Sequence, residues 1–129
     1  MRNQKNRMVL AGILSILCIL IISATANAQA IKTSVGDILS NPNQYDGKMV
    51  QIEGKVTALK AKISKKGNPY FTFKLFEGDK STTVFNFGGP SIREGDSVRV
   101  IGMYQKVKHV GRYTFYNEID ASKGSVGKL

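Results

Sequence analysis

Residue types that carry catalytic chemistry are scarce in this sequence. It has one cysteine, one histidine, no tryptophan and nine acidic residues among 129 positions. The acidic residues are scattered, and several lie beside glycine in turn segments, where a carboxylate caps local backbone amides. No Cys/His cluster, Ser/His/Asp arrangement, carboxylate pair or glycine-rich phosphate loop stands out. We therefore expect a protein that is not an enzyme and has no metal and no cofactor.

Negative charge is scarce relative to positive charge. There are 19 Lys and Arg residues against 9 Asp and Glu, a formal net charge of +10. Three of the basic residues, Arg2, Lys5 and Arg7, precede an apolar run, and without them 16 against 9 leaves +7 (16 − 9). Such an excess favours polyanionic partners, while the alternative is that the charge only keeps the protein soluble.

The N-terminal segment has the pattern of a secretory signal peptide. Residues 1–7 are basic, residues 8–22 are apolar, and an Ala-x-Ala sequence ends at Ala28. This pattern predicts a signal peptide over 1–28 and an exported protein, periplasmic or secreted. Cleavage after Ala28 would also remove the only cysteine.

Two alternatives exist for the same segment. Residues 8–26 form a possible retained anchor, although the run is at the short end of the roughly 20 residues that a spanning helix needs. The second alternative is lipidation at Cys18. A bacterial lipidation site requires a small residue directly before the cysteine, but Leu17 stands there. Contact with a membrane is thus expected only through an uncleaved signal.

Beyond the signal, alternation of apolar and polar residues predicts β-strands and no long helix. We expect a lead-in over 29–47 with one or two helical turns capped by Ser34, a barrel over 48–122, and a C-terminal tail over 123–129. Glycines at 54 and 102 fall within strands, where the lack of a side chain permits a sharp bend or a close backbone contact. The expected strands are 48–63, 70–76, 81–87, 97–105 and 112–121.

These strands resemble the OB-fold, a five-stranded Greek-key barrel of the all-β class. Three segments carry the resemblance: Gly47-Lys-Met-Val-Gln-Ile-Glu-Gly54, Tyr70-Phe-Thr-Phe-Lys-Leu-Phe76 and Arg93-Glu-Gly-Asp-Ser-Val98. They are similar to the anticodon-binding type of OB domain, including small exported bacterial proteins. The resemblance implies a ligand face across the second and third strands, bounded by the first-to-second and fourth-to-fifth strand loops.

Both of those loops are basic in this sequence, which predicts a cationic face. Lysines that follow a phosphate backbone and rings that stack on bases are the usual means of binding single strands. Phe85 and Phe87 are expected in the core, because a barrel this small needs large apolar groups inside, with one of them as an alternative stacking ring. The predicted binding residues are Lys60, Lys62, Lys65, Lys66, Tyr70, Lys74, Lys106, Lys108, Arg112 and Tyr113.

The expected function is an exported binding module for single-stranded nucleic acid or another anionic polymer. The alternative is an envelope protein that binds a protein partner or a small ligand on the same face, in stress tolerance. His109 is expected to be a surface residue. A haem-carrying role like that of the exported OB-barrel haem chaperones is not favoured, because His109 precedes the last strand and the C-terminal tail has no histidine.

Overall fold

The computed structural model describes residues 29–129. The predicted signal peptide, its cleavage point and the anchor and lipidation alternatives at Leu17 and Cys18 lie outside these residues. Within residues 29–129, no helix has the length and apolar character needed to cross a membrane.

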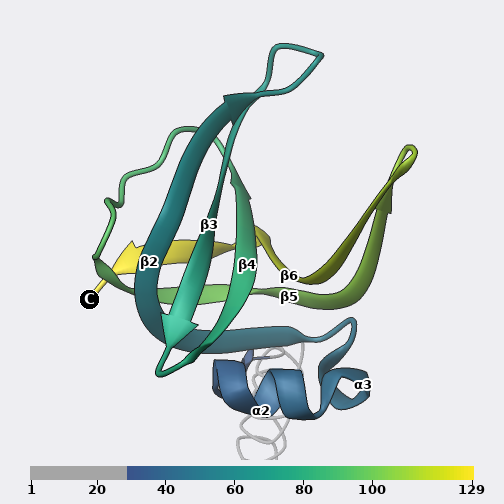
Figure 1. The fold of residues 1–129 in the computed structure, drawn as a ribbon, viewed down its shortest axis with the longest axis vertical. Coiled ribbons are helices and arrows are strands. Elements are labelled where there is room, and N and C mark those ends of the chain that lie inside the picture. The colour runs from purple at the N-terminus through teal and green to yellow at the C-terminus, as the bar shows by residue number, and fades with distance from the viewer. Residues whose placement is uncertain (1–28) are drawn as a thin grey trace, which may run out of the picture.

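Five strands close into a barrel (Figure 1). Neighbouring strands pair in the order β2-β3-β4-β6-β5, and β5 pairs back to β2 to complete the circuit. All pairs are antiparallel except β4 with β6, which is parallel. The all-β barrel expected from the alternation is confirmed. Its strands are β2 (Met49–Ile63), β3 (Pro69–Glu77), β4 (Lys80–Phe87), β5 (Ser97–Val110) and β6 (Tyr113–Lys128).

The last two strands are longer than predicted. β5 continues past Gln105 to Val110, and β6 continues past Ala121 to Lys128. Residues 125–128, expected as part of a tail, pair with residues 98–101 at the start of β5. At the other end the two strands form a hairpin that projects from the barrel (Figure 1). The projecting part is largely exposed, so it has no period-two burial pattern from which its length could be predicted.

Two glycines allow the barrel to close. A Cβ atom on Gly102 would lie 2.6 Å from the carbonyl oxygen of Asp120 and 3.0 Å from the Cα of Ala121. A Cβ atom on Gly54 would overlap the carbonyl oxygen of Phe76. Both obstacles are backbone, which cannot rotate away. Of the two effects expected at a strand glycine, a sharp bend or a close backbone approach, the structure shows a close approach at both positions.

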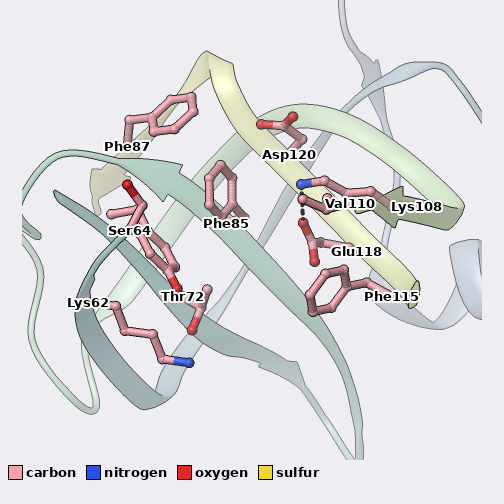
Figure 2. A pocket seen from close by; sticks show the side chains of 11 residues that line it. Lys62, Ser64, Thr72, Phe85, Phe87, Lys108, Val110, Phe115, Glu118 and Asp120 are labelled. Atoms are coloured by element: carbon pink, nitrogen blue, oxygen red, sulfur yellow. Dashed lines mark hydrogen bonds and ion pairs between the residues drawn. The ribbon is translucent and has the colours of Figure 1, made fainter. Parts of the chain in front are cut away.

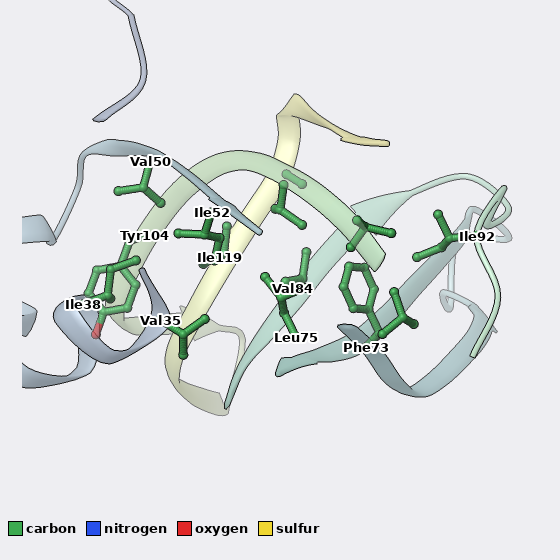
Figure 3. Packing of buried hydrophobic residues seen from close by; sticks show 14 of the residues in the cluster. Val35, Ile38, Val50, Ile52, Phe73, Leu75, Val84, Ile92, Tyr104 and Ile119 are labelled. Atoms are coloured by element: carbon green, nitrogen blue, oxygen red, sulfur yellow. The ribbon is translucent and has the colours of Figure 1, made fainter. Parts of the chain in front are cut away.

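The core fills the barrel from all its strands (Figure 3). Phe73, Leu75 and Val84 are fully buried, together with three residues of β2 and two of β5: Val50, Ile52, Val56, Val98 and Val100. On β4 it is Val84, not Phe85 or Phe87, that faces inward. The expectation that both phenylalanines lie in the core is wrong: Phe85 is half-buried and Phe87 is 61% exposed.

The lead-in packs beneath one end of the barrel (Figure 1). A short strand β1 (Ile31–Lys32) adds to the edge of β2, and two short helices follow, α2 (Val35–Ser40) and α3 (Pro42–Tyr45). Ser34 Oγ accepts a hydrogen bond from the Asp37 amide at 3.1 Å, which confirms the predicted N-cap.

The loop between β4 and β5, residues 88–96, also contributes to the core. Residues 88–96 contain a turn but no helix. Ile92 is nevertheless only 4% exposed and belongs to the core cluster. This loop therefore contributes one side chain, Ile92, to the core.

Candidate functional site

An apolar cavity opens on the outer face of the barrel, between the two projecting hairpins (Figure 2). Its volume is about 560 Å³, within the range of ligand sites. We call it the aromatic cleft. It is lined by Lys62, Ser64, Tyr70, Thr72, Phe85, Phe87, Lys108, Val110, Phe115, Glu118 and Asp120.

Strand register explains why these side chains share one face. Tyr70 on β3 pairs with Lys62 on β2 and with Phe87 on β4, and Thr72 pairs with Phe85. Directly paired residues project to the same side of a sheet. The ring centroid of Phe85 lies 5.6 Å from that of Tyr70 and 5.1 Å from that of Phe87. The three rings thus form a continuous aromatic surface.

A second groove continues the aromatic cleft outward between the two hairpin tips. We call it the tip groove. It shares Ser64, Tyr70, Val110 and Phe115 with the aromatic cleft and adds Lys65 from the β2–β3 tip and Gly111, Arg112 and Tyr113 from the β5–β6 tip. The two basic tips therefore border one face of the barrel, as their positions in the sequence predicted.

Several rings on this face are open to solvent. Phe87, Tyr113 and Phe115 are 61%, 54% and 43% exposed, respectively. Together with Val110, which is 49% exposed, these rings form a group of exposed apolar side chains on this face. Flat exposed rings are suited to stacking against planar ligand groups.

One predicted cation is not free. The ammonium of Lys108 lies 2.8 Å from Glu118 Oε1 and 4.4 Å from the ring centroid of Phe85 (Figure 2). Both side chains of this ion pair are mostly covered, with exposures of 19% for Lys108 and 7% for Glu118. Lys108 is thus held inside the aromatic cleft by a carboxylate and a ring face, and it covers part of Phe85.

The remaining predicted residues divide into two groups. Lys60, Lys66 and Lys74 are exposed and lie near the face without lining either cavity; Lys60 pairs with Thr72 and Lys74 with Thr83. Lys106 is directed elsewhere, because its ammonium binds Asn43 Oδ1 in α3 at 2.9 Å and its amide binds Asp46. The prediction that Lys106 lies on the binding face is wrong, because its ammonium is held at α3.

His109 belongs to the opposite side of the β5–β6 hairpin from the cavities. It is exposed, and its Nδ1 lies 3.1 Å from Thr114 Oγ1. The expected surface role is confirmed. Among residues 29–129, no group of three or more His, Cys, Asp or Glu side chains is placed to hold a metal ion.

A polar cluster at the base of the β5–β6 hairpin joins two buried side chains, Tyr104 and Thr82, to the exposed Asn117. The Tyr104 hydroxyl donates to Asn117 Oδ1, and Thr82 Oγ1 donates to the Asn117 carbonyl at 2.7 Å. Asn117 has φ of 52°, in the left-handed region that asparagine tolerates better than most residues. Burial raises the pKa of the Tyr104 phenol, and the Asp46 carboxylate raises it further, so the hydroxyl stays a donor. This cluster fixes where the hairpin leaves the barrel.

Comparison with known proteins identifies the fold. No family model and no curated protein matches the chain. Among solved structures, a chain of yeast Stn1 and Ten1 superposes with a TM-score of 0.61 at 11% identity, covering 79% of this chain and 64% of that one. The OB domain of Ta0387 from Thermoplasma acidophilum superposes with a TM-score of 0.50 at 16% identity, covering 78% of this chain and 88% of that domain. The barrel is an OB-fold.

A third OB-fold neighbour belongs to a larger protein. A putative aspartyl-tRNA synthetase from Leishmania major superposes with a TM-score of 0.51 at 19% identity, over 79% of this chain. The chain spans a fifth (20%) of that enzyme and about two-thirds (64%) of the yeast chain. At these identities the likeness shows the fold.

The OB-fold face contains residues that the sequence did not single out as ligand contacts. Phe115, Glu118 and Asp120 line the aromatic cleft from β6. Alternation along β6 could have placed Glu118 and Asp120 on the outer face, because they flank the buried Ile119. No signal marked Phe115, since the projecting hairpin has no buried face from which to count.

Proposed function

We propose that this OB-fold is a binding module, not an enzyme, and that it binds single-stranded nucleic acid across the aromatic cleft and the tip groove. The observation that carries the proposal is the order of side chains across the face. Exposed rings lie within the cavities, and cations lie at their rims: Lys62 and Lys65 on one hairpin and Arg112 on the other.

This order fits a strand bound with its bases inward and its phosphates outward. A base that stacks on an exposed ring contributes about 1–3 kcal/mol. Phosphates at the rim meet Lys62, Lys65 and Arg112, and no carboxylate lines the tip groove. The fold supports the same reading by analogy only, in that one OB-fold neighbour is named as a tRNA synthetase.

The proposal includes action after export, in keeping with the pattern of residues 1–28. Because nucleic acid is scarce outside the cytoplasm, the proposed ligands also include other anionic polymers.

The experiment that tests the proposal is an oligonucleotide titration over a range of salt concentrations. We expect the affinity for a single-stranded oligonucleotide to fall steeply with salt, with a log–log slope of about −2 from three rim phosphate contacts at about −0.7 each. Fluorescence anisotropy with a labelled oligonucleotide gives the slope. A flat salt dependence, or no binding at low salt, rejects the proposal.

A second candidate, a small ligand, is favoured by one observation. The aromatic cleft has a volume of about 560 Å³ and walls that are mostly apolar, which suits a compact ligand as well as a base. Binding of such a ligand would depend little on salt. The same titration therefore separates the two candidates.

A further inference from the structure

Two carboxylates stand on the β6 wall of the aromatic cleft, in a protein with an excess of positive charge. They are Glu118 and Asp120, which flank the buried Ile119 and pair in the ladder with Thr83 and Phe85. Asp120 therefore stands directly beside the central ring of the aromatic surface. Figure 2 shows both side chains near the Lys108 ammonium, with Phe85 beside them.

Each carboxylate uses one oxygen within the protein. Glu118 Oε1 accepts from Lys108 at 2.8 Å, and Asp120 Oδ1 accepts from the Ser122 amide at 2.9 Å. Among residues 29–129, Glu118 Oε2 and Asp120 Oδ2 have no hydrogen-bond partner. Glu118 is also a charged side chain with only 7% exposure, at the wall of an open cavity. Each of these two carboxylate oxygens is thus an acceptor that receives no hydrogen bond from the described part of the protein.

An ionised carboxylate accepts hydrogen bonds and donates none. Lys108 neutralises Glu118, whereas Asp120 forms no ion pair among residues 29–129. A phosphate next to Asp120 would be repelled, so the part of a nucleic acid that enters here is a base. The base must present N–H groups to the β6 wall. Cytosine, adenine and guanine carry an exocyclic amino group with two N–H donors, whereas thymine and uracil offer a single N–H, at N3, between two carbonyl oxygens that a carboxylate would repel.

We propose that Asp120, with Glu118 beside it, makes the aromatic cleft selective for bases that carry an amino group over thymine and uracil. This inference rests on the proposed function. Stacking on Tyr70, Phe87 and Phe115 tolerates any base. The carboxylates add the hydrogen bond that distinguishes one base from another, and a charged acceptor makes that hydrogen bond stronger than a neutral one.

The test compares oligo-dC with oligo-dT of equal length at one low salt concentration. We expect oligo-dC to bind about tenfold more tightly, an effect that one charge-assisted hydrogen bond can supply. Asp120→Asn should reduce the preference to about twofold or less, because an amide offers a donor as well as an acceptor and no longer disfavours the carbonyl of thymine. The Asn oxygen still accepts from the Ser122 amide.

Asp79→Asn is the matched control. Asp79 is exposed in the β3–β4 turn, at the other end of β3 from Tyr70, and its substitution makes the same charge change. We expect this variant to keep the full preference for oligo-dC.

A second measurement changes the ligand and leaves the protein intact. An oligonucleotide of N4,N4-dimethylcytosine keeps the ring and loses both amino protons, so the wild-type protein should bind it no better than oligo-dT. Equal binding of oligo-dC and oligo-dT, or a full preference retained by Asp120→Asn or by the dimethylated ligand, overturns the inference. Failure of the proposed function looks different, because then neither oligonucleotide binds.

Discussion

Replacement of Gly102 by alanine is expected to destabilise the barrel by about 3 kcal/mol, the upper part of the usual range for overpacking. The added Cβ would meet the Asp120 carbonyl oxygen at 2.6 Å, the Ile119 Cγ2 at 2.7 Å and the Ala121 Cα at 3.0 Å. Two of these three atoms are backbone of β6, next to the place where the β5–β6 register shifts. Relief of the contact requires the two strands to separate where the barrel closes.

Urea denaturation of the two proteins, followed by circular dichroism, measures this difference. Gly89→Ala is the matched control, because Gly89 has no positive φ and a Cβ there would meet no atom within 4 Å. We expect the control to lie within about 0.5 kcal/mol of the wild type, as for most surface substitutions. Equal midpoints for Gly102→Ala and the wild type would show that the barrel is not closed as described.

Simultaneous replacement of Lys62, Lys65 and Arg112 by glutamine is expected to weaken oligonucleotide binding on the order of a hundredfold at about 50 mM salt. Each rim cation that neutralises a phosphate adds about 0.7 to the slope of affinity against salt on log axes, so three of them account for about 2. The three side chains are exposed and form no ion pair among residues 29–129, so stability should change little.

A triple variant with the same charge change elsewhere on the surface separates the effect of the rim cations from the effect of net charge. Lys32, Lys80 and Lys123 are exposed and line neither cavity. Their replacement by glutamine should weaken binding by less than about fivefold, through the general field of the protein. Similar losses in the two triple variants would mean that net charge, and not the pair of hairpin tips, attracts the ligand.

Much of the fold was predictable because burial imposes a period on the sequence. Alternation in β2, β3 and β4 placed those strands to within about two residues of their observed bounds. Gly54 and Gly102 indicated the closing strands, because only glycine fits where backbones approach closely. The projecting hairpin could not be bounded in this way, since neither of its faces is buried.

The site was predicted less well, because alternation says which residues share a face but not which face is inside. On β4, either Val84 or the pair Phe85 and Phe87 could have filled the core, and residue size favoured the phenylalanines. The observed barrel puts the smaller Val84 inside because Phe73 and Leu75 from β3 already occupy the interior beside it. The consequence is functional, since two large rings remain outside on the ligand face.

The basic tips were correctly placed at one face, yet two of their lysines act otherwise than predicted. Lys106 binds Asn43 in α3, a contact across 63 positions of sequence that no local pattern reveals. Lys108 pairs with Glu118, which lies ten positions away across the hairpin. Long-range side-chain pairing is the part of the site that composition and spacing do not predict.

An NMR titration tests the shared face most directly. Amide shifts of the isotope-labelled protein are recorded while oligo-dC is added. The account predicts that the largest shift changes occur together on both hairpins and on the strands between them, at Ser64, Tyr70, Phe87, Tyr113 and Phe115. Changes confined to one hairpin, or concentrated in α2, α3 or the 88–96 loop, would contradict a single ligand face framed by the two tips.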